Sequence, residues 1–118
     1  MTTIRPCVHA RATELEQHAG ERVQVCGWLH AIRRLGGVSF LIIRDGSGLA
    51  QAVATTPAEL APLTESGAGV ESVITVAGRV ERAEQAPSGY ELREPAITII
   101  APVTEALPVT LNKRELKA

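Results

Sequence analysis

The side chains of this sequence that could bind a ligand through specific chemistry are two arginines, a glutamine and a phenylalanine. Arg33 and Arg34 are adjacent, and a guanidinium can pair with a phosphate or lie on a base edge. Gln51 carries a donor and an acceptor on one amide, which suits hydrogen bonding to the Watson–Crick edge of an unstacked base. The ring of Phe40 could stack on a base, an interaction worth about 1–3 kcal/mol. Together these residue types indicate a surface for single-stranded nucleic acid.

Each of these residues also has a simpler explanation. A single phenylalanine in an apolar segment is more often part of a core, and the same applies to Trp28 and Tyr90. Adjacent arginines are usually solvated surface, and Gln51 could be a solvent-facing strand residue. Aromatic residues make up only 3% of the chain, which disfavours a general stacking surface for any single strand. The residue types alone therefore leave the function open.

Residues for catalysis or metal binding form no recognisable pattern. The sequence contains no GxxxxGK[ST], GxGxxG, HExxH or GxSxG motif. The histidines lie in separate segments, at His9, His18 and His30. Asp45, the single aspartate, follows Arg44 in a turn, where we expect a local ion pair or an Asx-turn. We expect no catalytic centre, no metal site and no cofactor in this chain.

Composition and charge narrow the class of protein. The 118 residues, 45% hydrophobic and 21% charged, suffice for one domain with one core. Cys7 and Cys26 lack the spacing of a zinc site or a disulfide framework. The chain has neither an apolar run of membrane-spanning length nor the apolar core of a signal peptide, so we expect a cytoplasmic protein that does not enter membranes. The net charge of −1 does not indicate nucleic-acid binding, but residues 22–44 contain four arginines and no acid, so one face could be locally positive.

The residues that could bind a ligand fall on expected strands. Residues from Arg22 to Leu29 alternate between apolar and polar, which is the period of a half-buried strand, and the strand should continue toward Arg33. Gly36-Gly37 predicts a tight hairpin, and Asp45-Gly46-Ser47-Gly48 predicts a second turn. We expect one strand after each turn, at Val38–Arg44 and at Leu49–Ala54. The three strands form a meander.

A helix and further strands are expected in the second half. Thr56-Pro57-Ala58-Glu59 has the pattern of a capping box, followed by apolar residues at sparse helical spacing. Strand patterns resume at Ser72–Arg82 and, after the break at Ala86-Pro87-Ser88-Gly89, at Tyr90–Arg93 and Ala96–Ala101. This element order predicts an all-β protein with short helices, a five-stranded OB-fold Greek-key barrel with a helix between strands three and four.

The barrel is expected to occupy only part of the chain. Residues 1–20 form an N-terminal extension with a short helix that begins near Thr13 and lies against one barrel end. Residues 21–101 form the barrel. Residues 102–118 contain two prolines, no sustained periodicity and a charged end, which is typical of a hinge or linker toward a further domain.

Residues spread over most of the chain are shared with one known family. They are Gly20-Glu21-Arg22-Val23, Cys26-Gly27-Trp28, Arg33-Arg34-Leu35-Gly36-Gly37, Phe40-Leu41, Arg44-Asp45-Gly46-Ser47-Gly48-Leu49, Gln51, Pro87-Ser88-Gly89-Tyr90-Glu91 and Glu105-Ala106-Leu107-Pro108-Val109. Over residues 10–118 the chain resembles the N-terminal anticodon-binding domain of aspartyl- and asparaginyl-tRNA synthetases. In that family the domain is an OB barrel that holds the anticodon loop open over its first three strands. The resemblance implies that Phe40 stacks on an anticodon base, that Arg33 and Gln51 contact the central uridine, and that Glu91 approaches the first base.

The resemblance also suggests a subgroup. Aspartate and asparagine anticodons share their first two bases, so the surroundings of the third base decide between them. The corresponding positions are His30 and Pro87, and this pair is similar to the archaeal-type, non-discriminating aspartyl-tRNA synthetases, which charge both tRNAs with aspartate. Discriminating relatives place larger or charged groups there. The resemblance therefore implies a relaxed reading of the third base.

Two rival functions stay open, and so does the question whether the chain is part of a longer enzyme. In the family a catalytic domain, which binds ATP and Mg and through which the parent enzyme could form a homodimer, follows the position of Ala118. The chain could be a domain of such an aspartate-tRNA ligase or a free-standing relative. The rivals are a free-standing OB-fold protein that binds generic single-stranded nucleic acid and a protein-docking or dimerisation module. In none of these cases is the chain itself expected to be an enzyme.

Overall fold

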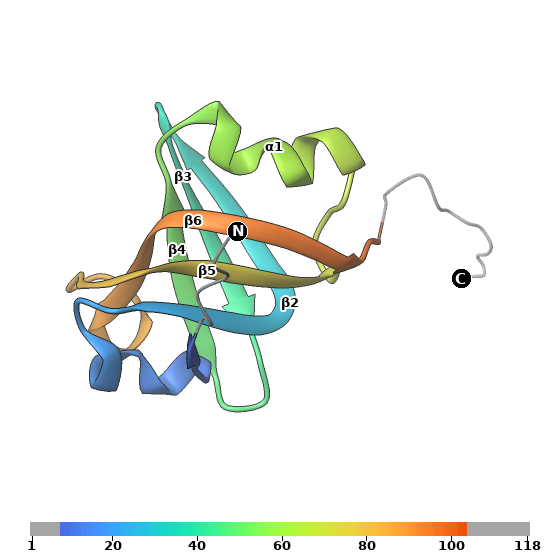
Figure 1. Ribbon diagram of the computed structural model, residues 1–118. Coiled ribbons are helices and arrows are strands. Elements are labelled where there is room, and N and C mark those ends of the chain that lie inside the picture. Colours follow the sequence, from blue (N-terminus) through green and yellow to red (C-terminus); the bar gives the residue numbers. More distant parts are fainter. Residues whose placement is uncertain (1–7, 104–118) are drawn as a thin grey trace, which may run out of the picture.

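The computed structural model describes residues 8–103, which form a closed β-barrel (Figure 1). Its long strands are β2 (Arg22–Leu35), β3 (Val38–Arg44), β4 (Leu49–Ala54), β5 (Val73–Arg82) and β6 (Tyr90–Ala101). The sheet order is β1-β2-β3-β4-β6-β5, and β2 also pairs with β5, which closes the barrel. The five long strands, with helix α1 (Pro57–Ser66) between β4 and β5, confirm the expected OB-fold. A sixth, two-residue strand, β1 (Val8–His9), runs parallel to β2 and was not predicted.

Strand β2 belongs to both halves of the barrel and bends in its middle. Its residues Arg22–Trp28 pair with β5, and Trp28–Leu35 pair with β3. Gly27 lies at this change of partner, where a Cβ atom would stand 2.3 Å from the carbonyl oxygen of Arg44. Only glycine allows the two backbones to approach this closely.

The barrel core comes from the inward-facing residues of every long strand. In β3 the buried residues Ser39, Leu41 and Ile43 alternate with half-buried ones, as a sheet with one covered face requires. The largest fully buried apolar side chains are Leu15, Val23, Val25, Leu29, Leu41, Ile43, Ile74, Val76, Val80 and Leu92. They form one core that extends from one end of the barrel to the other.

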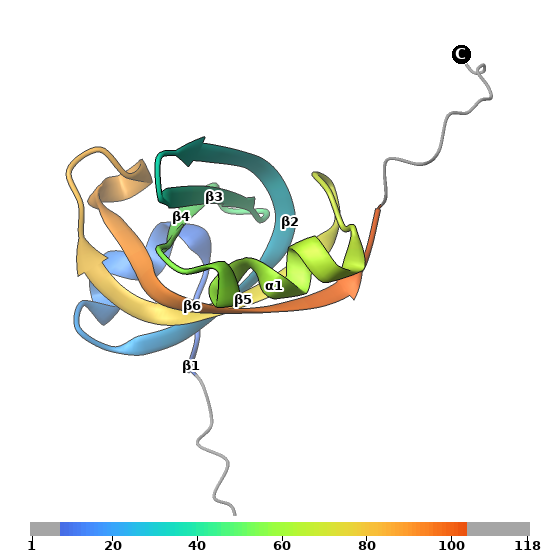
Figure 2. The same cartoon turned by 90° about the horizontal axis from the view of Figure 1, so that it is seen from above.

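Helical segments cover the two ends of the barrel (Figures 1 and 2). The 3-10 helix η1 (Ala12–His18, blue in Figure 1) buries Leu15 at one end, as expected for the N-terminal extension. Helix α1 lies across the other end, where it packs on β6 and buries Leu63. Among residues 8–103, no helix is long and apolar enough to cross a membrane.

Asp45 fastens η1 to the turn between β3 and β4. Its carboxylate accepts hydrogen bonds from the amides of Ala12 at 2.8 Å, Ser47 at 2.7 Å and Gly48 at 3.1 Å, and from the Ser47 hydroxyl. The expected Asx-turn is therefore present, whereas the alternative ion pair with Arg44 is not formed. Partial burial by itself would raise the pKa of Asp45, and the hydrogen bonds from Ser47, Ala12 and Gly48 outweigh it and lower the pKa.

Several local predictions need adjustment. The Thr56 hydroxyl caps α1 by accepting a hydrogen bond from the backbone amide of Glu59. In a capping box the Glu59 carboxylate would accept from the amide of Thr56, but here it accepts from the amide of Thr55. Two strand segments were expected where the structure has the single strand β6. Its pairing with β5 shifts register, and Glu94 adopts a positive φ at one of the shifts, so the strand continues beyond it. The expected linker lies outside the described residues, except for its first two.

Gly27→Ala should lower the free energy of unfolding by about 3 kcal/mol or more, at the upper end of the cost of overpacking, because the added methyl group would meet backbone rather than a side chain. Urea unfolding followed by circular dichroism measures this. Gly37→Ala is the matched control, since nothing lies within 4 Å of its added Cβ, and its effect should stay within about 0.5 kcal/mol. Equal effects of the two substitutions would show that the bend of β2 does not need glycine.

Candidate nucleic-acid interface

Four neighbouring strands place outward-facing side chains in two parallel rows, which we call the platform. Backbone pairing aligns β2 with β3, β3 with β4, and β4 with β6. The first row is Arg33, Phe40, Val53 and Arg93, and the second is Ala31, Ile42, Gln51 and Glu91. Because facing residues on adjacent strands lie about 5 Å apart, each row is a continuous line of contacting side chains across the barrel wall.

Phe40 lies on the outer face of β3, between Arg33 and Val53. Its strand neighbours Ser39 and Leu41 point into the barrel, and Phe40 itself is half-buried. The ring is therefore not part of the core, which was its simpler explanation from the sequence. It is also among the residues that line a hollow of the surface, as a stacking ring should be.

Gln51 and Glu91 form a buried polar pair at the centre of the platform. The two residues are only 7% and 4% exposed. Nε2 of Gln51 donates to Oε1 of Glu91 at 3.0 Å, and Nε of Arg93 donates to Oε2 at 2.6 Å. Gln51 is thus not the solvent-facing residue that its surroundings in the sequence suggested. The two donors compensate the burial of the carboxylate, which would otherwise be costly.

The connection between β5 and β6, with the short 3-10 helix η2 (Pro87–Gly89), borders two hollows over the platform. One hollow, of about 320 Å³, is lined by Ala31, Ile32, Arg33, Ile42, Gln51, Gln85 and Pro87. The other, of about 510 Å³, includes Phe40, Arg82, Gln85, Glu91 and Arg93 in its lining. Both volumes lie in the range of about 300–1,000 Å³ that is usual for small-molecule sites. Gln85 contributes to the lining of both hollows.

His30 occupies a bulge of β2 outside this lining. Leu29 pairs with Ile43 and Ala31 with the adjacent Ile42, so His30 is an extra residue without a partner in β3. Its Nδ1 lies 3.2 Å from Nη1 of Arg44. The structure therefore brings Pro87 to the platform, but it places His30 beside it.

Arg44 is held away from the platform by other partners. It makes two hydrogen bonds to the carboxylate of Glu71 and lies 5.3 Å from the ring centre of Trp28. These bonds raise the pKa of Arg44 and lower that of Glu71. Arg34 also lies away from the platform: it lines hollows beside α1, on the side of β2 opposite to Arg33.

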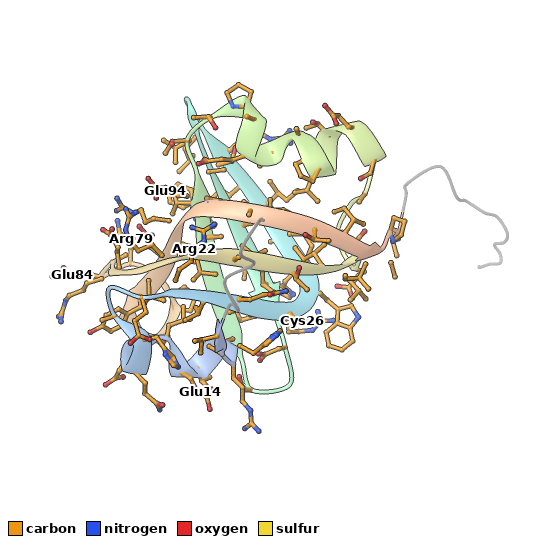
Figure 3. All side chains as sticks on the ribbon, in the orientation of Figure 1. Glu14, Arg22, Cys26, Arg79, Glu84 and Glu94 are labelled. Atoms are coloured by element: carbon orange, nitrogen blue, oxygen red, sulfur yellow. The ribbon has the colours of Figure 1, made fainter. Side chains whose placement is uncertain are left out.

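Within residues 8–103, three arginines form ion pairs with acids: Arg44, Arg79 and Arg93. Arg79 pairs with Glu81 and Glu94, and Figure 3 shows Arg79, Glu94 and Arg22 together at one side of the barrel. These pairs raise the pKa of Arg79 and lower that of Glu81. Within residues 8–103, Arg33 and Arg82 take part in no ion pair, and both line hollows of the platform. The same range holds no group of His, Cys, Asp and Glu that could bind a metal ion.

A family model described as the OB-fold nucleic acid binding domain, of the tRNA anticodon type, matches residues 23–100. The chain belongs to this family. Two ligases are similar to this chain: the aspartate–tRNA(Asp/Asn) ligase of Deinococcus radiodurans, 37% identical over 93% of the chain, and that of Haloferax volcanii, 39% identical over 84% of the chain. The domain spans only 23% of the length of each.

Solved structures show the same architecture. Asparaginyl-tRNA synthetase from Pyrococcus horikoshii superposes with a TM-score of 0.70 at 28% identity, covering 92% of the OB-fold domain and 26% of the synthetase chain. An OBody bound to hen egg-white lysozyme superposes with a TM-score of 0.70 at 23% identity, a likeness that shows the fold alone. The superposition includes 86% of this chain and all of the OBody chain.

Three residues were not found from the sequence: Arg93 of the platform, and Arg82 and Gln85, which line the hollows over it. Arg93 could have been found, because it lies two positions after Glu91 in a strand and therefore shares its face. Arg82 and Gln85 depend on where the connection between β5 and β6 folds, and no local pattern of the sequence specifies that. Of the predicted site residues, Phe40, Gln51, Arg33, Glu91 and Pro87 come together, whereas His30 and Arg34 do not.

Arg93→Ala in the OB-fold domain should lower the free energy of unfolding by about 1–3 kcal/mol, because the buried carboxylate of Glu91 loses one of its two donors. Thermal or urea unfolding measures the loss. The matched control is Arg82→Ala, which removes an exposed arginine of the same region and should change stability by less than about 0.5 kcal/mol. If the control were equally destabilised, the Arg93–Glu91 contact would not support the platform.

Proposed function

We propose that this OB-fold domain binds the anticodon loop of tRNA(Asp) and tRNA(Asn), as the recognition domain of an aspartate–tRNA ligase. One observation carries the proposal: a ring, an amide and an unpaired arginine lie in two adjacent rows on one outer face, beside hollows that can accept bases. Family membership and the names of the similar ligases support the same partner. The ligase chemistry, with ATP and Mg, belongs in this proposal to the rest of such an enzyme, which would act in the cytoplasm and could form a homodimer.

The platform suggests how an unstacked loop would bind. Phe40 provides the stacking ring, and Gln51 with Arg33 lies in the hollow where the central uridine would enter. Glu91 borders the neighbouring hollow, where the first base would lie. Arg33 and Arg82 are free to contact phosphates. Since these are few, binding should depend on stacking and hydrogen bonds more than on charge.

Phe40→Ala should weaken binding of an Asp anticodon stem-loop by about tenfold or more, because a base–aromatic stack is worth about 1–3 kcal/mol. Fluorescence anisotropy with the full 118-residue chain measures the affinity. Ile100→Ala removes an exposed apolar side chain of β6 outside the platform, so this control should bind as the wild type does.

Two outcomes would contradict the proposal. Equal competition by unstructured poly-U would indicate generic single-strand binding, and no affinity for any stem-loop would favour a protein-docking module. Unchanged affinity of Phe40→Ala, with the melting temperature preserved, would remove Phe40 from the site.

The third anticodon base should be read loosely if the chain serves both tRNAs. Pro87, a small uncharged residue, borders the hollow, and His30 is held by Arg44. We therefore expect stem-loops ending in C and in U to bind within about tenfold of each other, or 1.4 kcal/mol. A stem-loop with a changed central base serves as the discriminated control. A larger preference for one ending would indicate a domain specific for a single tRNA.

A further inference from the structure

The amide of Gln51 has one hydrogen-bonding atom without a partner. Its Nε2 donates to Glu91, but no donor within residues 8–103 reaches Oε1, although the residue is only 7% exposed. Buried acceptors are normally satisfied, so an unpartnered one beside a hollow indicates that a ligand supplies the donor. Gln51 is part of the lining of the hollow between Ala31 and Pro87, and a donor on a base that enters there would complete the amide.

The orientation of this amide is set by chemistry. A carboxylate only accepts hydrogen bonds, so the NH2 group of Gln51 must face Glu91. Arg93 holds the second oxygen of Glu91 at 2.6 Å and thereby fixes the carboxylate itself. A reversed amide would place Oε1 against a carboxylate oxygen, with repulsion and a lost hydrogen bond. The chain Arg93, Glu91 and Gln51 therefore leaves Oε1 as the free acceptor of the amide.

We propose that Glu91 is a positioning residue that fixes the polarity of the Gln51 amide and thereby makes it select uracil over cytosine. This inference rests on the proposed function and adds the origin of its selectivity. At ring position 3 uracil has an N–H donor, which matches the free Oε1, whereas cytosine has an acceptor there. An amide free to reverse would satisfy either base, so the selectivity arises from Glu91 acting through Gln51.

The proposal predicts how Glu91→Gln changes selectivity. Arg93 will bind the carbonyl oxygen of the new side chain, whose NH2 group then faces Gln51. The Gln51 amide can reverse to accept from it and turn its own NH2 group toward the hollow. The wild type should prefer a central U to a central C by about tenfold or more, because cytosine would leave the buried Oε1 facing another acceptor, and Glu91→Gln should reduce this ratio to about threefold or less.

A double-mutant cycle separates positioning from direct reading by Glu91. Affinities of the 118-residue chain are measured by fluorescence anisotropy for stem-loops with central U and central C, in the wild type, Glu91→Gln, Gln51→Ala and the double variant. Gln51→Ala should abolish the ratio, and Glu91→Gln should then add nothing to it. Glu94→Gln, an equal change at an exposed carboxylate of β6, should leave the ratio intact.

The outcomes are distinguishable from those of the proposed function. If the wild type binds no stem-loop, the proposed function fails and this inference fails with it. If the wild type prefers U but Glu91→Gln keeps the U-to-C affinity ratio, Glu91 does not position Gln51 and the inference alone is wrong. The same holds if Glu91→Gln alters only the preference at the first base, both with Gln51 present and in Gln51→Ala.

A measurement without RNA covers the case in which Glu91→Gln does not fold. In 15N spectra of the wild type, one of the two Nε2 protons of Gln51 should exchange with solvent at least about tenfold more slowly than the other, since it is bonded to a buried carboxylate. Gln85, which is exposed, gives the reference rate. Equally fast exchange of both Gln51 protons would overturn the inference.

Discussion

The sharing of β2 between the two halves of the barrel is the constraint on which the other features depend. One strand pairs with β5 and then with β3, and its bend at Gly27 is what lets the sheet close on itself. Closure fixes the register of every other strand, and the register fixes which side chains share the outer face. The ring of Phe40 and the amide of Gln51 are neighbours for this reason, although they lie on different strands.

The platform uses few free charges. Acids bind Arg44, Arg79 and Arg93, and these bonds hold the three side chains in defined positions. The basic segment between residues 22 and 44 does not produce the broad positive face that its sequence allowed, because Arg44 is bound to Glu71 and because Arg33 and Arg34 lie on opposite sides of β2. Recognition by such a surface relies on the fit of bases to hollows and on directed hydrogen bonds, which carry sequence information that a phosphate contact lacks.

The fold followed from local patterns, whereas part of the site did not. Alternation in β2, the β-branched composition of β3 and the turn residues between the strands were enough to predict the meander. The residues alone favoured a core position for Phe40, and only the family resemblance implied a stacking role. The burial of Gln51 depends on Glu91, forty residues later, and on a parallel pairing of β4 with β6 that no short segment encodes. Arg33 and Arg34 looked equivalent as a dipeptide, yet a strand sends adjacent side chains to opposite faces, and only Arg33 reaches the platform. The partner of Arg44 proved to be Glu71, which belongs to a distant loop, rather than the adjacent Asp45.

The bulge at His30 has a consequence for how this barrel can change over evolution. Since Leu29 and Ala31 pair with consecutive residues of β3, position 30 stands outside the ladder. Its side chain can be exchanged for one of another size or charge while Arg33 keeps its place opposite Phe40. The rim of the site is thus free to diversify independently of its centre, so that descendants of one ancestral domain could acquire different preferences without rebuilding the sheet.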